Sequence, residues 1–416
     1  MSITEQYQMV KEKYKEIGVD TDLAIQKLDQ LRISIQCWQG DDVAGFLQKA
    51  TLSGGIQVTG NYQGRARDIN ELKTDLSKVL SLVPGHHKIN LHAIYADIEQ
   101  ATALESIKKE HFDSWIAWAK KNQCGLDFNP TLFSHPLAKD GLTLSHPDES
   151  VRRYWIEHVK NTRKIADYMS KSLNDTVVHN IWIPDGFKDY PYHRLNPRNR
   201  LKNSLDDIFK EKNDNPLLVD TLESKLFGIG VEGYTVGSNE FYLSYALKNN
   251  VGVCIDSGHF HPTEEVSDKL SAIYPFVDHI LLHLSRPMRW DSDHVVSYDD
   301  ALKRIAESIV RENLFDKIHV GLDYFDASIN RIVAWVVGIR NVQKAFLKAM
   351  LEPNQMIEEM ENNLDFTSRL VWTEELKTYP MGIVYDYYCH MHHIPLSNEY
   401  LNIIKTYENN VLNERK

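Results

Sequence analysis

The stretch VGVCIDSGHFHPTE, which spans Val251 to Glu264, joins a short apolar run to a loop of acids and histidines. Its first five residues are apolar or small, as in a strand that is buried on both faces of a sheet. Asp256 and His259 follow directly, and both side-chain types bind divalent metal ions. Because the active sites of parallel barrels form where the strands end, this stretch predicts a site at the end of a buried strand. The fold then depends on whether other parts of the chain repeat the pattern.

Seven other short apolar runs have the same form, each ending in polar residues. They span Arg32–Asp42, Lys88–Asp97, Cys124–Pro130, Thr176–Gly186, Leu217–Gly230, Val277–Pro287 and Asp316–Asp326. Segments with apolar residues at helical spacing lie between the runs, at Glu71–Leu82, Leu104–Asn122, Ser150–Leu173, Leu201–Lys212, Asn239–Asn249, Thr263–Tyr274 and Tyr298–Glu312. Eight alternations of strand and helix predict an α/β protein with a (β/α)8 TIM barrel. A doubly wound open sheet is the structural alternative.

The predicted barrel occupies residues 31–328, with a helical segment on either side. Residues 1–30 are predicted to be an N-terminal helical segment, and residues 329–416 a C-terminal helical extension that packs on the barrel or makes oligomer contacts. Within the barrel, the stretch Gln39–Arg67 is long, polar and rich in glycine. Loops of this length in compact domains are often functional, so we expect a lid over the site.

Composition limits the classes of partner. The chain carries 58 acidic and 47 basic residues, a formal net charge of −11. Proteins that bind nucleic acid or anionic membranes need a basic face, so neither partner is expected. The four cysteines form no CxxC pair, the N-terminal residues lack the apolar core of a signal peptide, and no stretch approaches ~18 consecutive apolar residues. We therefore expect a soluble cytoplasmic protein.

The residues at the strand ends form two sets of candidate metal ligands. The first set comprises Glu223, Asp256, His283 and Asp323, from four successive strand ends. The second comprises His259, Asp291 and Asp293, with Asp256 as a bridge between the two. Donor sets rich in oxygen with a single histidine suit Mn²⁺, Mg²⁺ or Co²⁺ better than thiolate-bound zinc. The remaining strand ends offer His92, Trp182, Asp185 and Lys225.

Taken singly, each of these motifs has a plainer interpretation. One H-x-H or one D-x-D pair is more often a turn, a helix cap or a structural contact than a metal site. For this reason the following residues are interpreted as structural: Glu232, Glu240, His261, Asp278 and His279. The stretch CHMHHIP (Cys389–Pro395) lies beyond the barrel without an acidic partner at matching spacing, which is typical of a surface or interface cluster. Only the ordered recurrence of acids and histidines at four successive strand ends favours a metal site.

Longer motifs resemble those of a known family, L-rhamnose isomerase. They are CWQGDDVAGF (37–46), TGNYQGRAR (59–67), NLHAIYAD (90–97), HNIWIPDG (179–186), ESKLFGIGVEGYTVGSNEFY (223–242), DSGHFHPTE (256–264) and RWDSDHVV (289–296). The resemblance implies a (β/α)8 enzyme that interconverts the small sugars L-rhamnose and L-rhamnulose, an aldose–ketose isomerisation. It also implies a homotetramer with two Mn²⁺ ions per subunit, which Co²⁺ or Mg²⁺ could replace. The first ligand set would then hold a structural ion and the second a catalytic ion.

The same resemblance implies roles for further side chains in the reaction. Lys225, which forms an E-x-K with Glu223, would polarise O1 of the sugar, and His92 would open the pyranose ring. Hydrogen would move between C1 and C2 by a metal-mediated hydride shift. The other route, through an enediol, would need Asp323 or Glu223 as a base.

Apolar side chains would recognise the carbon skeleton of such a sugar. Trp38 and Trp182 could pack against its carbon faces. The methyl group at C6 of L-rhamnose requires an apolar pocket, for which Val43, Leu52 and Ile94 are the candidates.

Two other functions compete with an isomerase. A two-metal hydrolase of the phosphodiesterase type could use the same carboxylates, although the strand ends show no arginine cluster suited to a phosphate. A non-catalytic sugar-binding or scaffold protein could use one structural ion. Incubation with L-rhamnose and Mn²⁺ separates them, because only an isomerase forms a ketose.

Overall fold

Eight parallel strands close into a barrel in the computed structural model of the chain, which describes residues 1–47, 58, 60–98, 102–226, 233–287 and 291–415. The strands are β1 (Ile33–Gln36), β2 (Lys88–His92), β3 (Gly125–Asn129), β4 (Val177–Trp182), β6 (Leu218–Glu223), β8 (Gly252–Asp256), β9 (Ile280–Leu284) and β10 (Ile318–Leu322). Each strand pairs with the next in this order, and β10 pairs with β1. The predicted (β/α)8 barrel is therefore confirmed, and the open-sheet alternative is excluded.

The strands are short and almost wholly buried, as apolar runs of four to six residues predict. Their register sets the side chains at one end of the barrel next to one another. Asp256 pairs with His283 across β8 and β9, and Trp182 pairs with Glu223 across β4 and β6. Residues far apart in the sequence thus meet at the carboxyl ends of the strands.

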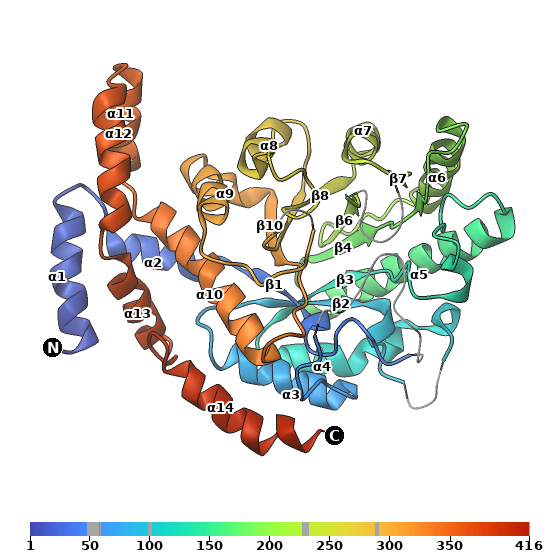
Figure 1. Cartoon of the computed structure of the whole chain (residues 1–416), viewed down its shortest axis with the longest axis horizontal. Coiled ribbons are helices and arrows are strands. Elements are labelled where there is room, and N and C mark those ends of the chain that lie inside the picture. The colour runs from blue at the N-terminus through green and yellow to red at the C-terminus, as the bar shows by residue number, and fades with distance from the viewer. Residues whose placement is uncertain (48–57, 59, 99–101, 227–232, 288–290, 416) are drawn as a thin grey trace.

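Helices surround the barrel, one after each strand (Figure 1). They are α3 (Ile69–Leu80), α4 (Asp113–Lys121), α5 (Glu149–Leu173), α6 (Leu195–Ile208), α7 (Asn239–Asn249), α8 (Val266–Ile273) and α9 (Asp300–Arg311). The side chains of Asp68, Asp148 and Asp299 cap the N-termini of α3, α5 and α9. The eighth position is taken by α10 (Arg331–Met350), which packs against α9 and α3.

Two local features differ from the sequence prediction. The predicted helix Leu104–Asn122 is helical only over α4, and residues 104–106 and 109–112 form 3-10 turns. The carbonyl of Ile107 accepts from Asn161 Nδ2 on α5, and that of His111 accepts from the backbone N–H of Asp97, so these carbonyls are bonded outside a helix. In addition, β5 (Gly186–Phe187) and β7 (Tyr234–Thr235) form a small antiparallel sheet that was not predicted.

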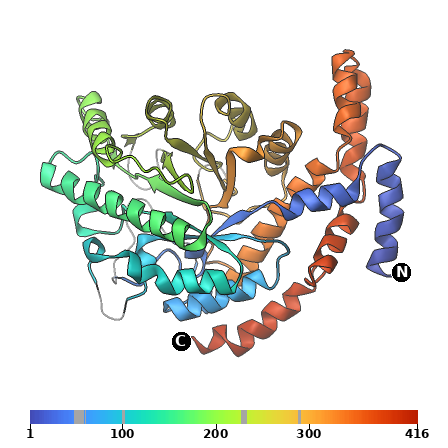
Figure 2. The ribbon, with the colours of Figure 1, turned by 180° about the vertical axis from the view of Figure 1, so that it is seen from behind.

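The helices at the two ends of the chain lie together on one side of the barrel (Figures 1 and 2). They are α1 (Ile3–Lys15), α2 (Thr21–Asp29), α11 (Asn354–Asn362), α12 (Phe366–Glu375), α13 (Met381–Met391) and α14 (Tyr400–Asn410). Tyr7 of α1 stacks on Tyr387 of α13 with ring centroids 3.8 Å apart. By contrast, α11 and α12 project from the body and bury no residue. Of the helices in the described ranges, none is long and apolar enough to cross a lipid bilayer.

Candidate active site

A cavity of about 610 Å³ opens at the carboxyl ends of the barrel strands. This volume includes part of the open mouth of the cavity. One part of its wall is polar and carries His92, Asn129, Asn180, Glu223, His259, His283, Asp291, Asp293 and Asp323. The other part is apolar and carries Trp38, Val43, Phe133, Trp182 and Phe325. A wall of this mixed kind matches a ligand that has both hydroxyl groups and carbon faces.

Four of the predicted metal ligands converge on one point. Glu223, Asp256, His283 and Asp323 each offer a ligand atom, and these four atoms all lie within 4.8 Å of one another. Nδ1 of His283 is 3.4 Å from Oε1 of Glu223, 3.8 Å from Oδ2 of Asp256 and 3.3 Å from Oδ2 of Asp323. The first predicted ligand set is therefore brought together by the fold.

The electrostatics of this group reflect its burial among like charges. Burial raises the pKa of the Asp256 carboxyl well above its usual range, and the nearby carboxylates of Asp323 and Asp291 add to the effect. Burial lowers the pKa of the His283 imidazole, but Cys254, Glu223 and Asp323 together outweigh it and the pKa is raised. Carboxylates crowded in a low-dielectric site repel one another unless a cation lies among them.

The second predicted set lies beside the first but is less tightly gathered. Nε2 of His259 is 3.0 Å from Oδ2 of Asp291, and Nδ1 of the same ring is 3.5 Å from Oε1 of Glu223. The carboxyl of Asp293 has its pKa raised well above the usual range by burial and then by Asp291. Thus His259 bridges the two sets, and Asp291 and Asp293 face the same cavity.

The donor chemistry of the two sets fits divalent ions. Five carboxylates and two imidazoles meet in one buried region, and hard oxygen donors of this kind suit Mn²⁺, Mg²⁺ or Co²⁺. Cys254 also has its thiol near Glu223 and His283, a contact that was not predicted. The fold thus provides a candidate metal centre, and its donor set does not single out one metal.

The aromatic residues of the cavity pack edge to face around His92. The ring of Trp38 lies 4.9 Å from that of His92, and Phe133 lies 5.5 Å from His92 and 5.7 Å from Trp182. Burial lowers the pKa of His92 to about 4, so its imidazole is neutral near pH 7. Among the described residues, Nδ1 of His92, Nε1 of Trp182 and Oδ1 of Asn129 are buried without a hydrogen-bond partner. Buried polar atoms of this kind point to a polar ligand.

Four residues of the wall were not predicted from the sequence. They are Asn129, Phe133, Asn180 and Phe325. Asn129 is the last residue of β3, and Asn180 alternates with Trp182 on β4, so the two-residue period of a strand could have indicated Asn180. Nδ2 of Asn180 donates to Oε2 of Glu223 at 2.5 Å. Phe133 and Phe325 lie in loops, where no periodicity applies.

Other predicted residues lie elsewhere. Lys225 is buried two residues beyond Glu223 and is not among the described residues that line the cavity. Ile94 does not line the cavity either, because its side chain packs over Gly45. Leu52 lies outside the described residues, as do residues 48–57 and 59 of the predicted lid.

The prediction that Asp185 contributes to the site is corrected, because its side chain has a structural role. Its carboxylate is buried and accepts four hydrogen bonds, from the backbone N–H and hydroxyl groups of Thr143 and Ser145. It therefore pins the loop after β3, and these partners lie some forty residues away in the sequence. In the stretch Cys389–Pro395, predicted to be a surface or interface cluster, Nε2 of His392 lies 2.9 Å from Oδ1 of Asp29 and Cys389 is buried.

Comparison with known proteins assigns the chain to a protein family. Residues 1–415 match the family described as L-rhamnose isomerase. A protein named L-rhamnose isomerase from Mannheimia succiniciproducens is 54% identical over 415 residues, covering 100% of this chain and 99% of that protein. Proteins of the same name from Klebsiella pneumoniae and Salmonella typhi are each 51% identical over 410 residues, covering 98% of both chains.

Proposed function

Since this chain belongs to the L-rhamnose isomerase family, we propose that it interconverts L-rhamnose and L-rhamnulose. The identity with named relatives over the full length carries this proposal. The cavity supports it independently, because carboxylates, imidazoles and aromatic rings line the same cavity. A sugar presents hydroxyl groups to the first kind of wall and C–H faces to the second.

Two metal ions are proposed to bind among the carboxylates. Glu223, Asp256, His283 and Asp323 would hold one, and His259, Asp291 and Asp293, with Asp256 as a bridge, would hold the other. Divalent ions bound there supply Lewis-acid polarisation of the sugar oxygens. The proposed metal is Mn²⁺, with Co²⁺ or Mg²⁺ as replacements, on the resemblance to the family and on the oxygen-rich donors.

His92 is proposed to open the pyranose ring. The hydrogen transfer needs the open-chain aldehyde, so a proton must first leave O1 and another reach the ring oxygen. Because its pKa is lowered to about 4 by burial, the imidazole of His92 is an unprotonated acceptor at neutral pH. Its Nδ1, which faces no partner among the described residues, is the atom for this transfer. The role of Lys225 in polarising O1 rests on the resemblance to the family.

The hydrogen of C2 then moves to C1, while the proton of O2 moves to O1. This converts the aldehyde into a ketone without any external oxidant. An enediol route would instead need Glu223 or Asp323 to take the C2 proton. Glu223 already accepts from Asn180 at 2.5 Å, and Asp323 accepts from Nε1 of Trp38 at 3.2 Å. Direct hydride transfer from C2 to C1 is proposed because two divalent ions would polarise O1 and O2 without a base at C2.

The apolar wall is proposed to select the sugar. Trp38, Phe133 and Trp182 offer faces and edges to the carbon skeleton, and Val43 and Phe325 supply the apolar surface for the C6 methyl. Ile94 and Leu52 were also predicted for this pocket. Ile94 packs away from the cavity wall, so Val43 is the member of that trio that carries the proposal.

A two-metal phosphodiesterase is not favoured. No arginine is among the described residues that line the cavity, so a phosphodianion would lack a bidentate partner. The test is incubation of the Mn²⁺-loaded protein with L-rhamnose and, separately, with an aryl phosphodiester. Formation of a ketose without phosphodiester cleavage supports the isomerase, and the opposite outcome supports the hydrolase.

A homotetramer in the cytoplasm is proposed for the assembled enzyme. The α11–α12 hairpin exposes Leu364, Phe366, Leu370 and Val371, each at least half exposed, which is typical of a face that another subunit covers. All four cysteines are free and buried, as in proteins of reducing compartments. Sedimentation at several protein concentrations measures the subunit number.

A further inference from the structure

The turn after β1 places Val43 in the wall of the cavity, and its backbone is strained at two consecutive residues. Asp42 and Val43 have φ angles of +58° and +60°. Residues other than glycine rarely adopt this left-handed conformation, and a β-branched residue such as valine is a marked exception. Such backbone persists only where the surroundings hold it in place. The contacts around this turn therefore determine where Val43 lies.

Arg331 makes the strongest of these contacts. Its Nε donates to Oδ1 of Asp42 at 2.9 Å and its Nη2 donates to Oδ2 at 2.7 Å, a two-pronged ion pair. Both side chains are buried, with 4% and 8% of their surface exposed. Two parallel charge-assisted hydrogen bonds fix the orientation of a carboxylate as well as its position. Arg331 thus holds Asp42, the residue directly before Val43.

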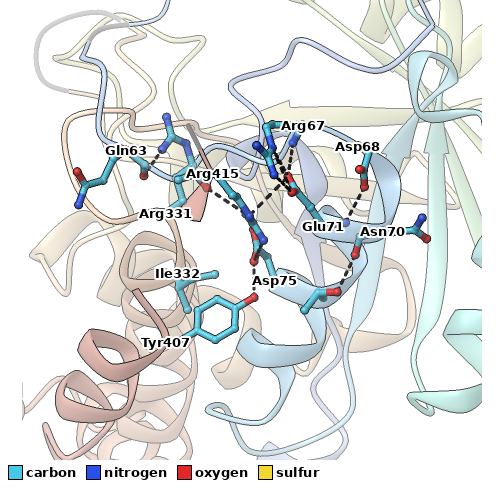
Figure 3. Close-up of polar contacts among 12 residues, drawn as sticks. Gln63, Arg67, Asp68, Asn70, Glu71, Asp75, Arg331, Ile332, Tyr407 and Arg415 are labelled. Atoms are coloured by element: carbon cyan, nitrogen blue, oxygen red, sulfur yellow. Dashed lines mark hydrogen bonds and ion pairs between the residues drawn. The ribbon is translucent and has the colours of Figure 1, made fainter. Parts of the chain in front are cut away.

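The same guanidinium also holds a second segment. Nη1 of Arg331 donates to the carbonyl of Tyr62 at 2.6 Å and to that of Gln63 at 3.2 Å, as the close-up in Figure 3 shows for Gln63. Every nitrogen of the guanidinium is therefore engaged. The turn that bears Val43 and the segment at Tyr62 are joined through one side chain.

The C-terminal helices keep that second segment in place. Tyr62 donates its hydroxyl to Glu408 of α14 at 3.0 Å. Nη1 of Arg415 donates to the carbonyl of Gly64 at 3.0 Å, and Arg415 is itself held by Asp75 at 2.6 Å (Figure 3). The acceptors that Arg331 uses are thus fixed by contacts outside the cavity.

The position of Arg331 in its own helix gives it no stabilising role there. It is the first residue of α10, where the partial positive charge of the helix terminus disfavours a cation. Asn330 already caps this helix, since its side chain accepts from the N–H groups of Ile332 and Val333. Capping and helix stability therefore do not account for an arginine at this position, whereas the pairing with Asp42 does.

We propose that Arg331 is a positioning residue for the sugar, which acts through Asp42 to fix Val43 against the substrate. It governs substrate affinity and selectivity and takes no part in the hydrogen transfer. The proposal rests on the proposed function for the identity of the sugar, but its structural content does not depend on it.

Kinetics of Arg331→Gln measure the proposed role. We expect KM for L-rhamnose to rise about fivefold or more, because an apolar contact with the substrate is displaced, while kcat stays within about twofold. The matched control is Arg340→Gln. Arg340 is equally buried on the same helix but donates only to the backbone carbonyls of Leu82, Pro395 and Ser397. It should cost stability and leave KM unchanged, and an equal rise in KM for both variants would overturn the proposal.

A double-mutant cycle with Val43→Ala shows whether Arg331 acts through Val43. If it does, adding Arg331→Gln to Val43→Ala should raise KM by less than about twofold, because the contact is already lost. Arg331→Lys should not restore the wild-type KM, since lysine cannot form the two-pronged pair. Fully multiplicative effects on KM would contradict the proposal.

A crystal structure of Arg331→Gln, or of Asp42→Asn if the first variant does not fold, separates this proposal from the proposed function. Residues 42 and 43 are expected to leave the left-handed conformation, with Val43 displaced from the cavity wall. An unchanged turn would overturn the positioning role whichever sugar the enzyme uses. If the turn is displaced in the variant but the wild-type protein does not isomerise L-rhamnose, only the assigned substrate is refuted.

Discussion

Replacing Asp41 by asparagine should change how the stability of the protein depends on pH. Asp41 precedes the strained pair at Asp42 and Val43, and its side chain is fully buried. Its Oδ1 accepts from the hydroxyl of Tyr95 at 2.7 Å, and its Oδ2 accepts from the N–H of Gly45 at 2.7 Å. Burial raises the pKa of this carboxyl from 3.8 to about 7, against the opposing effect of the two hydrogen bonds.

The raised pKa sets both the sign and the size of the effect. Between pH 3.8 and about pH 7 the folded protein keeps a proton on Asp41 that the unfolded chain has released. The stability that this proton contributes is complete below pH 3.8 and is lost as the pH rises through 7. The loss is about 1.4 kcal/mol per pH unit below the folded-state pKa, or about 2 kcal/mol between pH 5 and pH 7.

The Asp41→Asn variant would have no carboxyl to titrate at this position. The side-chain carbonyl of the new amide could accept from Gly45 and its NH₂ group could donate to the hydroxyl of Tyr95, so both contacts would survive. Urea unfolding of wild type and Asp41→Asn at pH 5 and pH 7.5 should therefore show the variant gaining about 2.5 kcal/mol on the wild type at the higher pH. In a Tyr95→Phe variant that keeps Asp41, the loss of stability should extend to higher pH than in the wild type. The reason is that the Tyr95 hydrogen bond lowers the pKa of Asp41. A difference between wild type and Asp41→Asn that is the same at both pH values would refute the reasoning.

Further outcomes follow from the site. Chelation should abolish isomerase activity and lower Tm, and Mn²⁺ should restore both, because bound ions stabilise only the folded state; full activity of metal-stripped protein would exclude the two-metal site. His259→Ala and Asp291→Ala should remove activity with little change in Tm, whereas Glu223→Ala, at the end of a barrel strand, should also lower Tm in the metal-loaded protein. Wild-type turnover in either of the first two variants would show that the second ion is misplaced. Val43→Ala should lower kcat/KM for L-rhamnose relative to L-mannose by about fourfold, because burying the C6 methyl group of the sugar is worth about 0.8 kcal/mol. An unchanged ratio would place the methyl pocket elsewhere.

The barrel could be predicted because its strands are buried on both faces. A parallel strand of this kind is a short apolar run, and all eight runs recur in the structure at their predicted places. The first ligand set could be predicted for the same reason, since Glu223 and Asp256 are the last residues of their strands. The ends of neighbouring strands in a closed barrel lie side by side, so residues that end successive strands lie close together in space.

The rest of the site depends on contacts that local patterns do not reveal. Asp185 ends an apolar run as the candidate ligands do, but Thr143 and Ser145 from another loop surround its carboxylate. Ile94 follows β2 within a 3-10 turn, so the alternation of a strand no longer fixes its direction. Phe325 lies in the loop after β10, where no periodicity indicates that its side chain lines the cavity.

The pairing of Arg331 with Asp42 is a contact across 289 residues, and neither residue stands out in the sequence. Its effect is visible only through backbone angles at Asp42 and Val43, which composition and periodicity do not predict. Residues that position a site are for this reason harder to infer from sequence than residues that line it.

The most direct test of the central claim is NMR of the Mn²⁺-loaded protein acting on L-rhamnose that carries deuterium at C2. The account predicts L-rhamnulose with the deuterium retained on C1, because the hydrogen moves directly between the two carbons. Absence of any ketose would contradict the assignment as an L-rhamnose isomerase, and a ketose that has lost the deuterium to solvent would contradict the direct transfer.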